Sequence, residues 1–463
     1  MTTRRLLAFV ALLIVGAGAH AADRSRPNVV FILLDDLGWG DLHCYGHPYA
    51  KTPNIDRLAD EGLRFLQCYA TGVTCCPSRT GFMTSKFPAT YPVYPAAGGF
   101  ALRPTITALL KQQGYATGHF GKWHIGPDTA PGTYGIDTIG SEQDDAGGKK
   151  KRRNTSGGRD SYIYDDAIAF IEQHRDEPFY VNVWGHIPHH PIDPSSELLE
   201  AFGPLSVDES KFPPEMQSKF AYCKKLGGDV NQHMRAYLAD VKSADDDVGR
   251  LLRRLDELGL RETTIVAVSS DQGCAGAAEV EEQKKKRKAV DGDDNRLNAM
   301  GYPGPFRGGK HSQLEGGVRI PFIVRWPGHV PSARVDKESV ISGADWLPTL
   351  CRIAGVKIDA GDFDGEDASA AWLGQSTHVR NKPLLWKTSA TNSDPAIRDG
   401  QWKLHGSHRR RGTVELYDVV ADPGEHRNLA AGRPDIAQAL TAKLDAWVAT
   451  LPKSYVKSDD RDD

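Results

Sequence analysis

Runs of apolar residues recur along the chain up to residue 326. The first, at 28–34, is continuous and rich in β-branched residues, which is typical of a strand buried on both faces of a sheet. Similar runs follow at 65–69, 115–120, 178–184, 263–270 and 322–326. Between them, apolar residues at three- and four-residue spacing predict helices, at 52–62, 80–85, 106–113, 165–174 and 234–258. This alternation predicts an α/β fold with a mainly parallel or mixed central sheet flanked by helices.

The pattern changes towards the C-terminus. A helix starting at 344–350 closes the large domain, and 355–374 is enriched in Asp, Gly and Ala, which indicates a linker. Short alternating segments and a helical pattern at 435–451 then predict a small antiparallel sheet with one helix packed on it. We therefore expect a large N-terminal domain over 22–360 and a smaller α+β domain over 375–455.

The N-terminus has the features of a secretory signal. Arg4 and Arg5 precede an apolar run at 6–15, which is too short to span a bilayer comfortably. The small residues after it end in Ala19-His20-Ala21, which suits signal peptidase. We expect a signal peptide over 1–21, a periplasmic or secreted protein, and no stable membrane insertion once the signal is cleaved. The alternatives are an uncleaved anchor or a lipoprotein, and the lack of a cysteine after the apolar run argues against lipidation.

The overall charge argues against a nucleic-acid partner. The net charge is -3 and the pI is about 6.6, so polyanions can be attracted only by local patches. Basic runs occur at 149–153 and 284–288, inside polar insertions; these are either solvated loops or segments that steer an anionic substrate. The seven cysteines are an odd number, which leaves at least one thiol unpaired in an exported protein.

Polar residues follow several of the apolar runs. Asp35 and Asp36 end the first run, where two adjacent carboxylates are costly unless a cation neutralises them; a helix N-cap is the alternative. Asp271 and Gln272 end the run at 263–270. Because ligands bind beyond the carboxyl ends of parallel strands, we expect one site there. It gathers Asp35, Asp36, Lys122, His124, His189, Asp271 and Gln272. Carboxylates with an amide oxygen suit a hard cation, with calcium favoured over magnesium.

The segment Cys75-Cys76-Pro77-Ser78-Arg79 is unusual as packing. Pro77 lacks an amide hydrogen and turns the backbone, so Cys75 is interpreted as a nucleophile held at a bend beside the fixed cation of Arg79. A small buried cysteine next to a turn is the alternative. The helix predicted at 80–85 would point its N-terminus at Cys75, where its amides favour anions.

The pattern Cys-x-Pro-Ser-Arg at 75–79 resembles the signature of the type I sulfatases, in the alkaline phosphatase superfamily. The family's cysteine is oxidised to formylglycine (3-oxoalanine), whose aldehyde hydrates to a diol. The resemblance therefore implies that a formylglycine-generating enzyme modifies Cys75. Further segments resemble the family in the same order, at 114–124, 188–191, 269–273 and 308–321. Gln272 departs from the pattern, because the family usually has Asn or His there.

The resemblance implies a role for each site residue. The metal ligands are Asp35, Asp36, Asp271, Gln272 and the modified Cys75. Lys122 and Lys310 hold the sulfate ester, Arg79 orients the diol and His124 contacts it. One diol hydroxyl attacks sulfur while His189 donates a proton to the departing alcohol, and deprotonation of the second hydroxyl, by His124 or an acid near it, then expels sulfate.

Export and the two basic insertions favour a sulfated polysaccharide or oligosaccharide as substrate. Two alternatives remain: a phosphonate or phosphodiester hydrolase of the same superfamily, and a non-catalytic glycan-binding relative.

Overall fold

The computed structural model describes residues 26–93, 98–126, 130–140, 157–275, 297–388, 394–406 and 414–452. The predicted signal peptide and both basic runs, at 149–153 and 284–288, lie outside these residues. None of the described helices combines the length and the apolar character that a membrane crossing requires.

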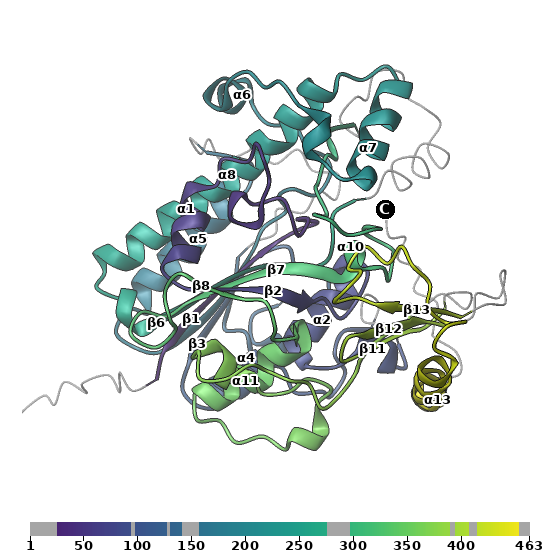
Figure 1. The fold of residues 1–463 in the computed structure, drawn as a ribbon. Helices are drawn as coiled ribbons and strands as arrows, with labels where there is room; N and C mark the ends of the chain where they lie inside the picture. The colour runs from purple at the N-terminus through teal and green to yellow at the C-terminus, as the bar shows by residue number, and fades with distance from the viewer. Residues whose placement is uncertain are drawn as a thin grey trace, which may run out of the picture.

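A nine-stranded sheet forms the centre of the molecule (Figure 1). Its order is β4-β3-β5-β1-β6-β7-β2-β8, with β9 beside β2. The strands are β1 Asn28–Leu34, β2 Leu63–Tyr69, β3 Ala116–Gly121, β4 Thr138–Ile139, β5 Phe179–Trp184, β6 Thr264–Ser270, β7 Arg319–Arg325, β8 Arg334–Asp336 and β9 Ile341–Ser342. The six predicted strands correspond to β1, β2, β3, β5, β6 and β7. The predicted α/β class with a mixed, mainly parallel sheet is therefore confirmed.

Strand β7 runs opposite to the rest of this sheet. It pairs antiparallel with both β6 and β2, whereas the other described pairings are parallel. The carboxyl ends of β1, β2, β3, β5 and β6 consequently meet at one edge, and the beginning of β7 lies at that same edge. A segment that precedes β7 can therefore reach the same place as segments that follow the other strands.

Helices cover both faces of the sheet. Val30 and Ile32 of β1 belong to the apolar cluster under α1 (Pro53–Asp60), α5 (Ser161–Gln173) and α8 (Val230–Glu257). Phe31 points the other way and stacks on Trp346 with 4.1 Å between ring centroids. That second face packs against α2 (Cys75–Thr84), α4 (Ile106–Lys111) and α11 (Trp346–Ile353).

Burial on both faces explains why the strands appear in the sequence as continuous apolar runs. The remaining described α-helices of this part are α6 Ser196–Phe202, α7 Pro214–Lys225, α10 Glu315–Val318 and α12 Ser369–Trp372.

Helix α2 begins five residues earlier than its sequence predicts. Ser78 N donates to Thr74 O at 3.2 Å, so Cys75 is the first helical residue rather than part of a preceding bend. Pro77 lies in the first turn, where its missing N–H breaks no helical hydrogen bond. The prediction of a helix starting at 80 was therefore wrong, because a proline was taken as a breaker where the helix tolerates it.

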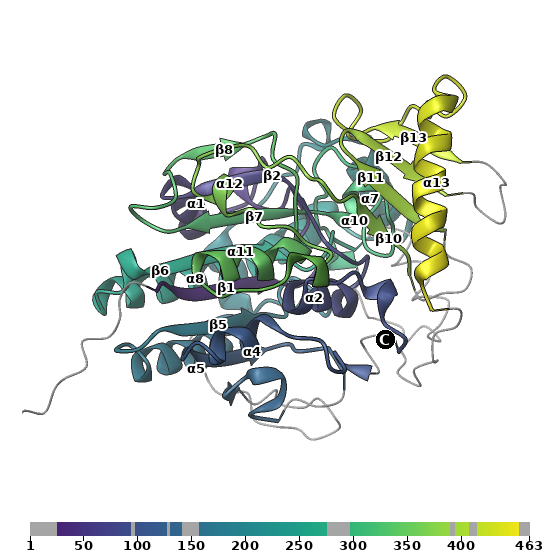
Figure 2. The same cartoon turned by 90° about the horizontal axis from the view of Figure 1, so that it is seen from below.

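A second, four-stranded antiparallel sheet follows, in the order β10-β11-β12-β13. Its strands are β10 Leu384–Trp386, β11 Ala396–Asp399, β12 Trp402–His405 and β13 Glu415–Asp418. Helix α13, Pro434–Thr450, packs on it (Figure 2), with Leu440 and Leu444 buried against the sheet. The predicted small antiparallel sheet with one helix is confirmed.

Buried charges join the second sheet to the loop before β7. Lys403 Nζ of β12 lies 2.9 Å from Glu315 Oε1 and 3.4 Å from Glu425 Oε1, and all three side chains are fully buried. Glu425 Oε2 also accepts the backbone N–H of Glu315 at 2.6 Å. Since a buried charge is costly without a partner, this network fixes the start of α10 relative to the second sheet.

Candidate active site

The residues predicted from strand ends do meet at one edge of the large sheet. Asp35 and Asp36 follow β1, and Asp271 and Gln272 follow β6. Cys75 starts α2, a few residues after β2. Three further residues complete the set: Lys122 after β3, His189 after β5 and Lys310 before the reversed β7. Because Lys310 precedes its strand, it reaches this edge only through the antiparallel direction of β7.

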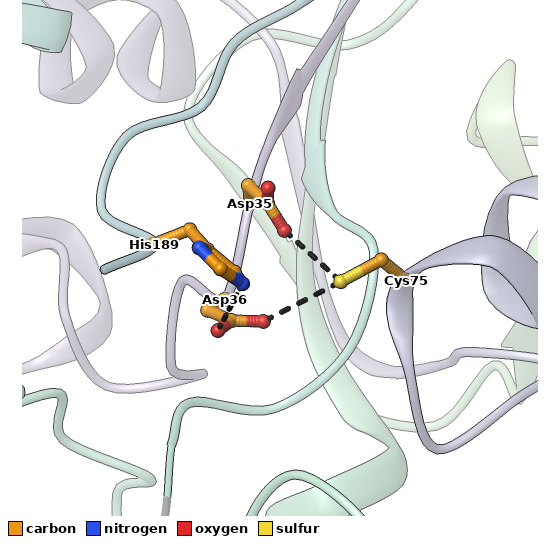
Figure 3. A group of neighbouring side chains, drawn as sticks. All are labelled: Asp35, Asp36, Cys75 and His189. Carbon is orange, nitrogen blue, oxygen red and sulfur yellow. Dashed lines mark hydrogen bonds and ion pairs between the residues drawn. The ribbon is translucent and has the colours of Figure 1, made fainter. Parts of the chain in front are cut away.

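The centre of the site is a cluster of Asp35, Asp36, Cys75 and His189 (Figure 3). Cys75 Sγ lies 3.3 Å from Asp35 Oδ1 and 3.9 Å from Asp36 Oδ1. His189 Nε2 lies 3.8 Å from Asp36 Oδ2. One ligand atom of each residue lies within 4.8 Å of those of the others. His189 thus lies beside Asp35, Asp36 and Cys75, three of the predicted metal ligands.

Asp271 and Gln272 adjoin this cluster from β6. Asp271 Oδ1 accepts the backbone N–H of Asp36 at 3.1 Å, and Oδ2 accepts Nε and Nη2 of Arg79 at 3.0 and 2.8 Å. Gln272 Nε2 donates to Asp36 Oδ1 and lies 3.6 Å from Cys75 Sγ. Gln272 Oε1 is buried and has no hydrogen-bond partner among the described residues. The two residues therefore lie where the sequence predicts them.

Three cations surround these acids. Lys122 Nζ contacts Asp35 Oδ2 at 2.5 Å, and Lys310 Nζ lies 2.9 Å from Asp36 Oδ2. Fully buried Arg79 pairs with Asp271 and lies 3.6 Å from Asp35. Although burial opposes its ionisation, Asp35 has a pKa well below its usual value, because Lys122, His189, Arg79 and Lys310 stabilise the carboxylate. Burial and the charge of Asp35 raise the pKa of Asp271 to about 7, against the effect of Arg79, so the three acids at most balance the three cations. An added divalent cation would leave a net positive site for an anion.

The unmodified thiol of Cys75 is poorly suited to attack. Burial, followed by the charge of Asp35, raises its pKa well above the usual value, against the effect of Lys122 and Lys310. A thiol rather than a thiolate is therefore present at neutral pH, and the thiol is the weaker nucleophile. Because Cys75 is the first residue of α2, the helix N-terminus, which favours anions, faces the cluster.

The two candidate proton-transfer histidines differ in setting. His124 has a left-handed backbone, with φ at +57°, and remains accessible to solvent. The surrounding protein, and then the charges of Lys122 and Arg79, lower its pKa to about 3, so the ring is neutral at neutral pH. His189 Nδ1 lies 2.6 Å from His190 O and so donates to it, which leaves Nε2 to face Asp36. Burial lowers the pKa of His189, against the effect of Asp35 and Asp36.

Sequence reasoning did not find Arg159 and Asp160, which precede α5. Asp160 Oδ2 accepts the backbone N–H groups of His186 and Ile187 at 2.6 and 2.8 Å. Arg159 contacts the carbonyls of the same loop. An acid before a helix is an ordinary N-cap signal, so nothing in the sequence connects this pair with His189.

The family model described as Sulfatase matches residues 27–356. The chain belongs to the sulfatase family. It is therefore a sulfuric ester hydrolase with the alkaline phosphatase-like fold. A second model, N-sulphoglucosamine sulphohydrolase, C-terminal, matches residues 309–451 and covers the antiparallel sheet.

Relatives span almost the whole sulfatase chain. Human arylsulfatase A is 28% identical over 526 residues, with 97% of this chain and 94% of that protein covered. The N-acetylgalactosamine-6-O-sulfatase of Bacteroides thetaiotaomicron is 26% identical, with 92% and 94% covered. The structure of Ps i-CgsB in complex with k-i-k-neocarrahexaose superposes with a TM-score of 0.73 at 22% identity, over 94% of this chain and 95% of that chain. This last likeness shows the shared fold.

Family membership implies a formylglycine and a metal, and the residues present fit both. Asp35, Asp36 and Asp271 supply the carboxylates that a hard divalent cation prefers. The orphaned Oε1 of Gln272 adds an amide oxygen, because a half-turn of the amide exchanges its oxygen with the nitrogen that now faces Asp36. The longer side chain of glutamine therefore does not prevent the residue from reaching the cluster.

Proposed function

We propose that this sulfatase removes sulfate from a sulfated saccharide, with Cys75 converted to formylglycine and a divalent cation held by Asp35, Asp36, Asp271 and Gln272. The observation that carries the proposal is the contact of Cys75 Sγ with Asp35 and Asp36 at the N-terminus of α2. Calcium is favoured over magnesium, since a cage built mainly of protein oxygens suits the larger ion.

The absent groups would supply the nucleophile and the central charge. A hydrated formylglycine offers a hydroxyl group, and a bound cation offsets negative charge on the sulfate oxygens. The ammonium groups of Lys122 and Lys310 flank the cluster, and we assign them to the remaining ester oxygens. Arg79 stays protonated and orients residue 75 through its pairs with Asp35 and Asp271.

Two histidines divide the proton transfers. We assign the doubly protonated ring of His189 as the donor: Nδ1–H stays on His190 O, and the Nε2 proton, which Asp35 and Asp36 favour, passes to the departing alcohol oxygen. His124, which is neutral and open to solvent, accepts a proton when sulfate is released. The protein groups thus cover binding, orientation and both proton transfers.

A carbohydrate substrate is supported by the relative named for N-acetylgalactosamine 6-O-sulfate and by the structure that holds a neocarrahexaose. The basic runs at 149–153 and 284–288 agree with a polyanionic substrate. Export of the protein, which we propose from the N-terminal segment, would place it where such polymers occur.

The test is a panel of defined sulfated saccharides assayed beside an aryl sulfate and a phosphodiester, with calcium or magnesium supplied. We expect the highest kcat/KM on one sulfated saccharide, with calcium. Dominant turnover of the phosphodiester would replace this proposal with a phosphodiester hydrolase. Aryl sulfate turnover without any saccharide turnover would overturn the substrate class and leave the sulfatase reaction in place.

A further inference from the structure

The loop that carries His189 is held from outside the catalytic cluster by Arg159. Its Nη2 donates to His189 O at 2.5 Å and to His186 O at 3.2 Å. Its Nη1 donates to Pro191 O at 2.6 Å. One planar guanidinium therefore holds three carbonyls of a six-residue segment, which a flexible single-point cation could not do in the same geometry.

The guanidinium is itself fixed by α8. Nη2 lies 3.2 Å from Asp240 Oδ2, and Asp240 is buried with 1% of its surface exposed. The adjacent Asp160 binds the loop's amide groups, while Arg159 binds its carbonyls. Neighbouring residues thus satisfy both kinds of backbone group in one loop, and a buried acid determines where the cation lies.

This support bears directly on the reacting side chain. Ile187 O accepts the backbone N–H of Asp35 at 3.0 Å, so the loop is also aligned with the first acid of the cluster. Within the loop, His190 O fixes the ring of His189 by accepting Nδ1–H at 2.6 Å. The direction of His189 Nε2 therefore depends on the position of the backbone that Arg159 holds.

We propose that Arg159, fixed by Asp240, is a positioning residue that aims His189 Nε2 at the departing alcohol oxygen. The inference rests on the proposed role of His189 as proton donor. It predicts selectivity by leaving group. A sugar or alkyl alcohol is a poor leaving group that needs the proton, whereas a nitrophenolate leaves without one. Misplacing His189 should therefore slow the first class of ester far more than the second.

The experiment compares Arg159→Met with wild-type enzyme on a sulfated sugar that the wild type hydrolyses and on 4-nitrophenyl sulfate. We expect kcat on the sugar ester to fall roughly 30- to 100-fold and kcat on the aryl ester to fall less than about 3-fold, since small misplacements of a reacting group cost up to about 10²-fold. Arg159→Lys should restore part of the loss. Arg254→Met, which removes exposed ion pairs elsewhere on α8, is the matched control and should match wild type on both esters.

Two reference measurements make the result decisive. His189→Ala should show a larger leaving-group-dependent loss, and adding Arg159→Met to it should change little, because both changes remove one function. If His189→Ala is selective and Arg159→Met lowers both esters equally, Arg159 is merely structural and the inference is wrong. If His189→Ala itself shows no selectivity, the proposed donor role fails and the inference fails with it. Should Arg159→Met not fold, Asp240→Asn replaces it with the same expectation, and equal losses on both esters would again overturn the inference.

Discussion

The ammonium group of Lys310 lies 2.9 Å from Oδ2 of Asp36, although the two residues are 274 positions apart in the chain. Their contact depends on the reversed direction of β7, which brings the segment before that strand to the carboxyl ends of its neighbours. The backbone of Lys310 is also anchored, since its N–H donates to Cys274 O at 2.8 Å. The lysine is therefore presented to the site from a fixed backbone.

Replacing Lys310 by Met should weaken productive binding of the sulfate ester. Removing one charged contact to a reacting anion typically costs about 10²-fold or more in rate, and we expect kcat/KM to fall by about that factor. Steady-state kinetics on one sulfate ester measure the effect. Lys242→Met, which breaks an exposed pair with Asp246 on α8, is the control and should retain wild-type kinetics. A Lys310 variant with unchanged kcat/KM would remove this residue from the site.

Substitution of Cys75 by Ala should abolish turnover, because alanine cannot be oxidised to the aldehyde whose hydrate attacks the sulfate ester. Cys76→Ala is the matched control: its thiol packs in the apolar cluster beneath the sheet, so we expect some loss of stability and retained activity. Peptide mass spectrometry should find the aldehyde at position 75 after expression with a formylglycine-generating enzyme. Activity in Cys75→Ala, or an aldehyde at position 76, would refute the assignment.

Loss of the amide oxygen at Gln272 should weaken cation binding. In Gln272→Leu we expect calcium affinity to fall about tenfold or more, whereas Gln272→Asn retains an oxygen and should lose less. Because a ligand that binds only the folded state raises stability, the calcium-dependent rise in Tm measures this without an activity assay. Gln232→Leu, at an exposed position of α8, should leave that rise unchanged. An unaltered calcium response in Gln272→Leu would exclude the residue as a ligand.

Glu315 should make folding sensitive to acid. Burial opposes its ionisation, but Lys403, Arg319 and Arg398 lower its pKa from 4.5 to about 2. The unfolded chain therefore takes up the proton first, so this stabilisation is complete above pH 4.5 and is lost as the pH falls towards about 2. Chemical unfolding across this range should show a shallower pH dependence for Glu315→Gln, together with lower stability at neutral pH. Glu257→Gln, at the exposed end of α8, should keep the wild-type slope; a wild-type slope in Glu315→Gln would contradict the prediction.

The sequence predicted the site best where a polar residue directly follows a buried apolar strand. The runs that became β1 and β6 are apolar on both faces, so their ends and the polar residues Asp35 and Asp271 were located within a residue or so. Direction was harder, because an apolar run is the same in either orientation, and nothing in 322–326 showed that β7 is antiparallel. Pro77 misled the helix prediction, since its effect depends on whether it lies in the first turn or in the interior of a helix.

Contacts made only in three dimensions could not be predicted. The support of the His189 loop by Arg159 joins a helix start, a loop and the buried Asp240 of α8, and no local pattern links them. The strand ends predicted that His189 and Asp36 share one site, but the 3.8 Å approach of His189 Nε2 to Asp36 Oδ2 follows from loop geometry. Residue types at strand ends therefore indicate which groups take part, and packing determines how they are aimed.

The buried ion network of Lys403, Glu315 and Glu425 ties the C-terminal sheet to the segment before β7 that carries Lys310. The C-terminal sheet therefore supports the site structurally. A chain truncated after α11 would still contain Asp35, Asp36 and Asp271, and Glu315 would keep its contacts with Arg319 and Tyr69. Glu315 would lose the ion pair with Lys403 and the link to Glu425, a few residues from Lys310. Such a fragment should still bind a divalent cation, but it should bind the sulfate ester more weakly because Lys310 is no longer held in position. Cation binding and binding of the sulfate ester would then depend on different parts of the chain.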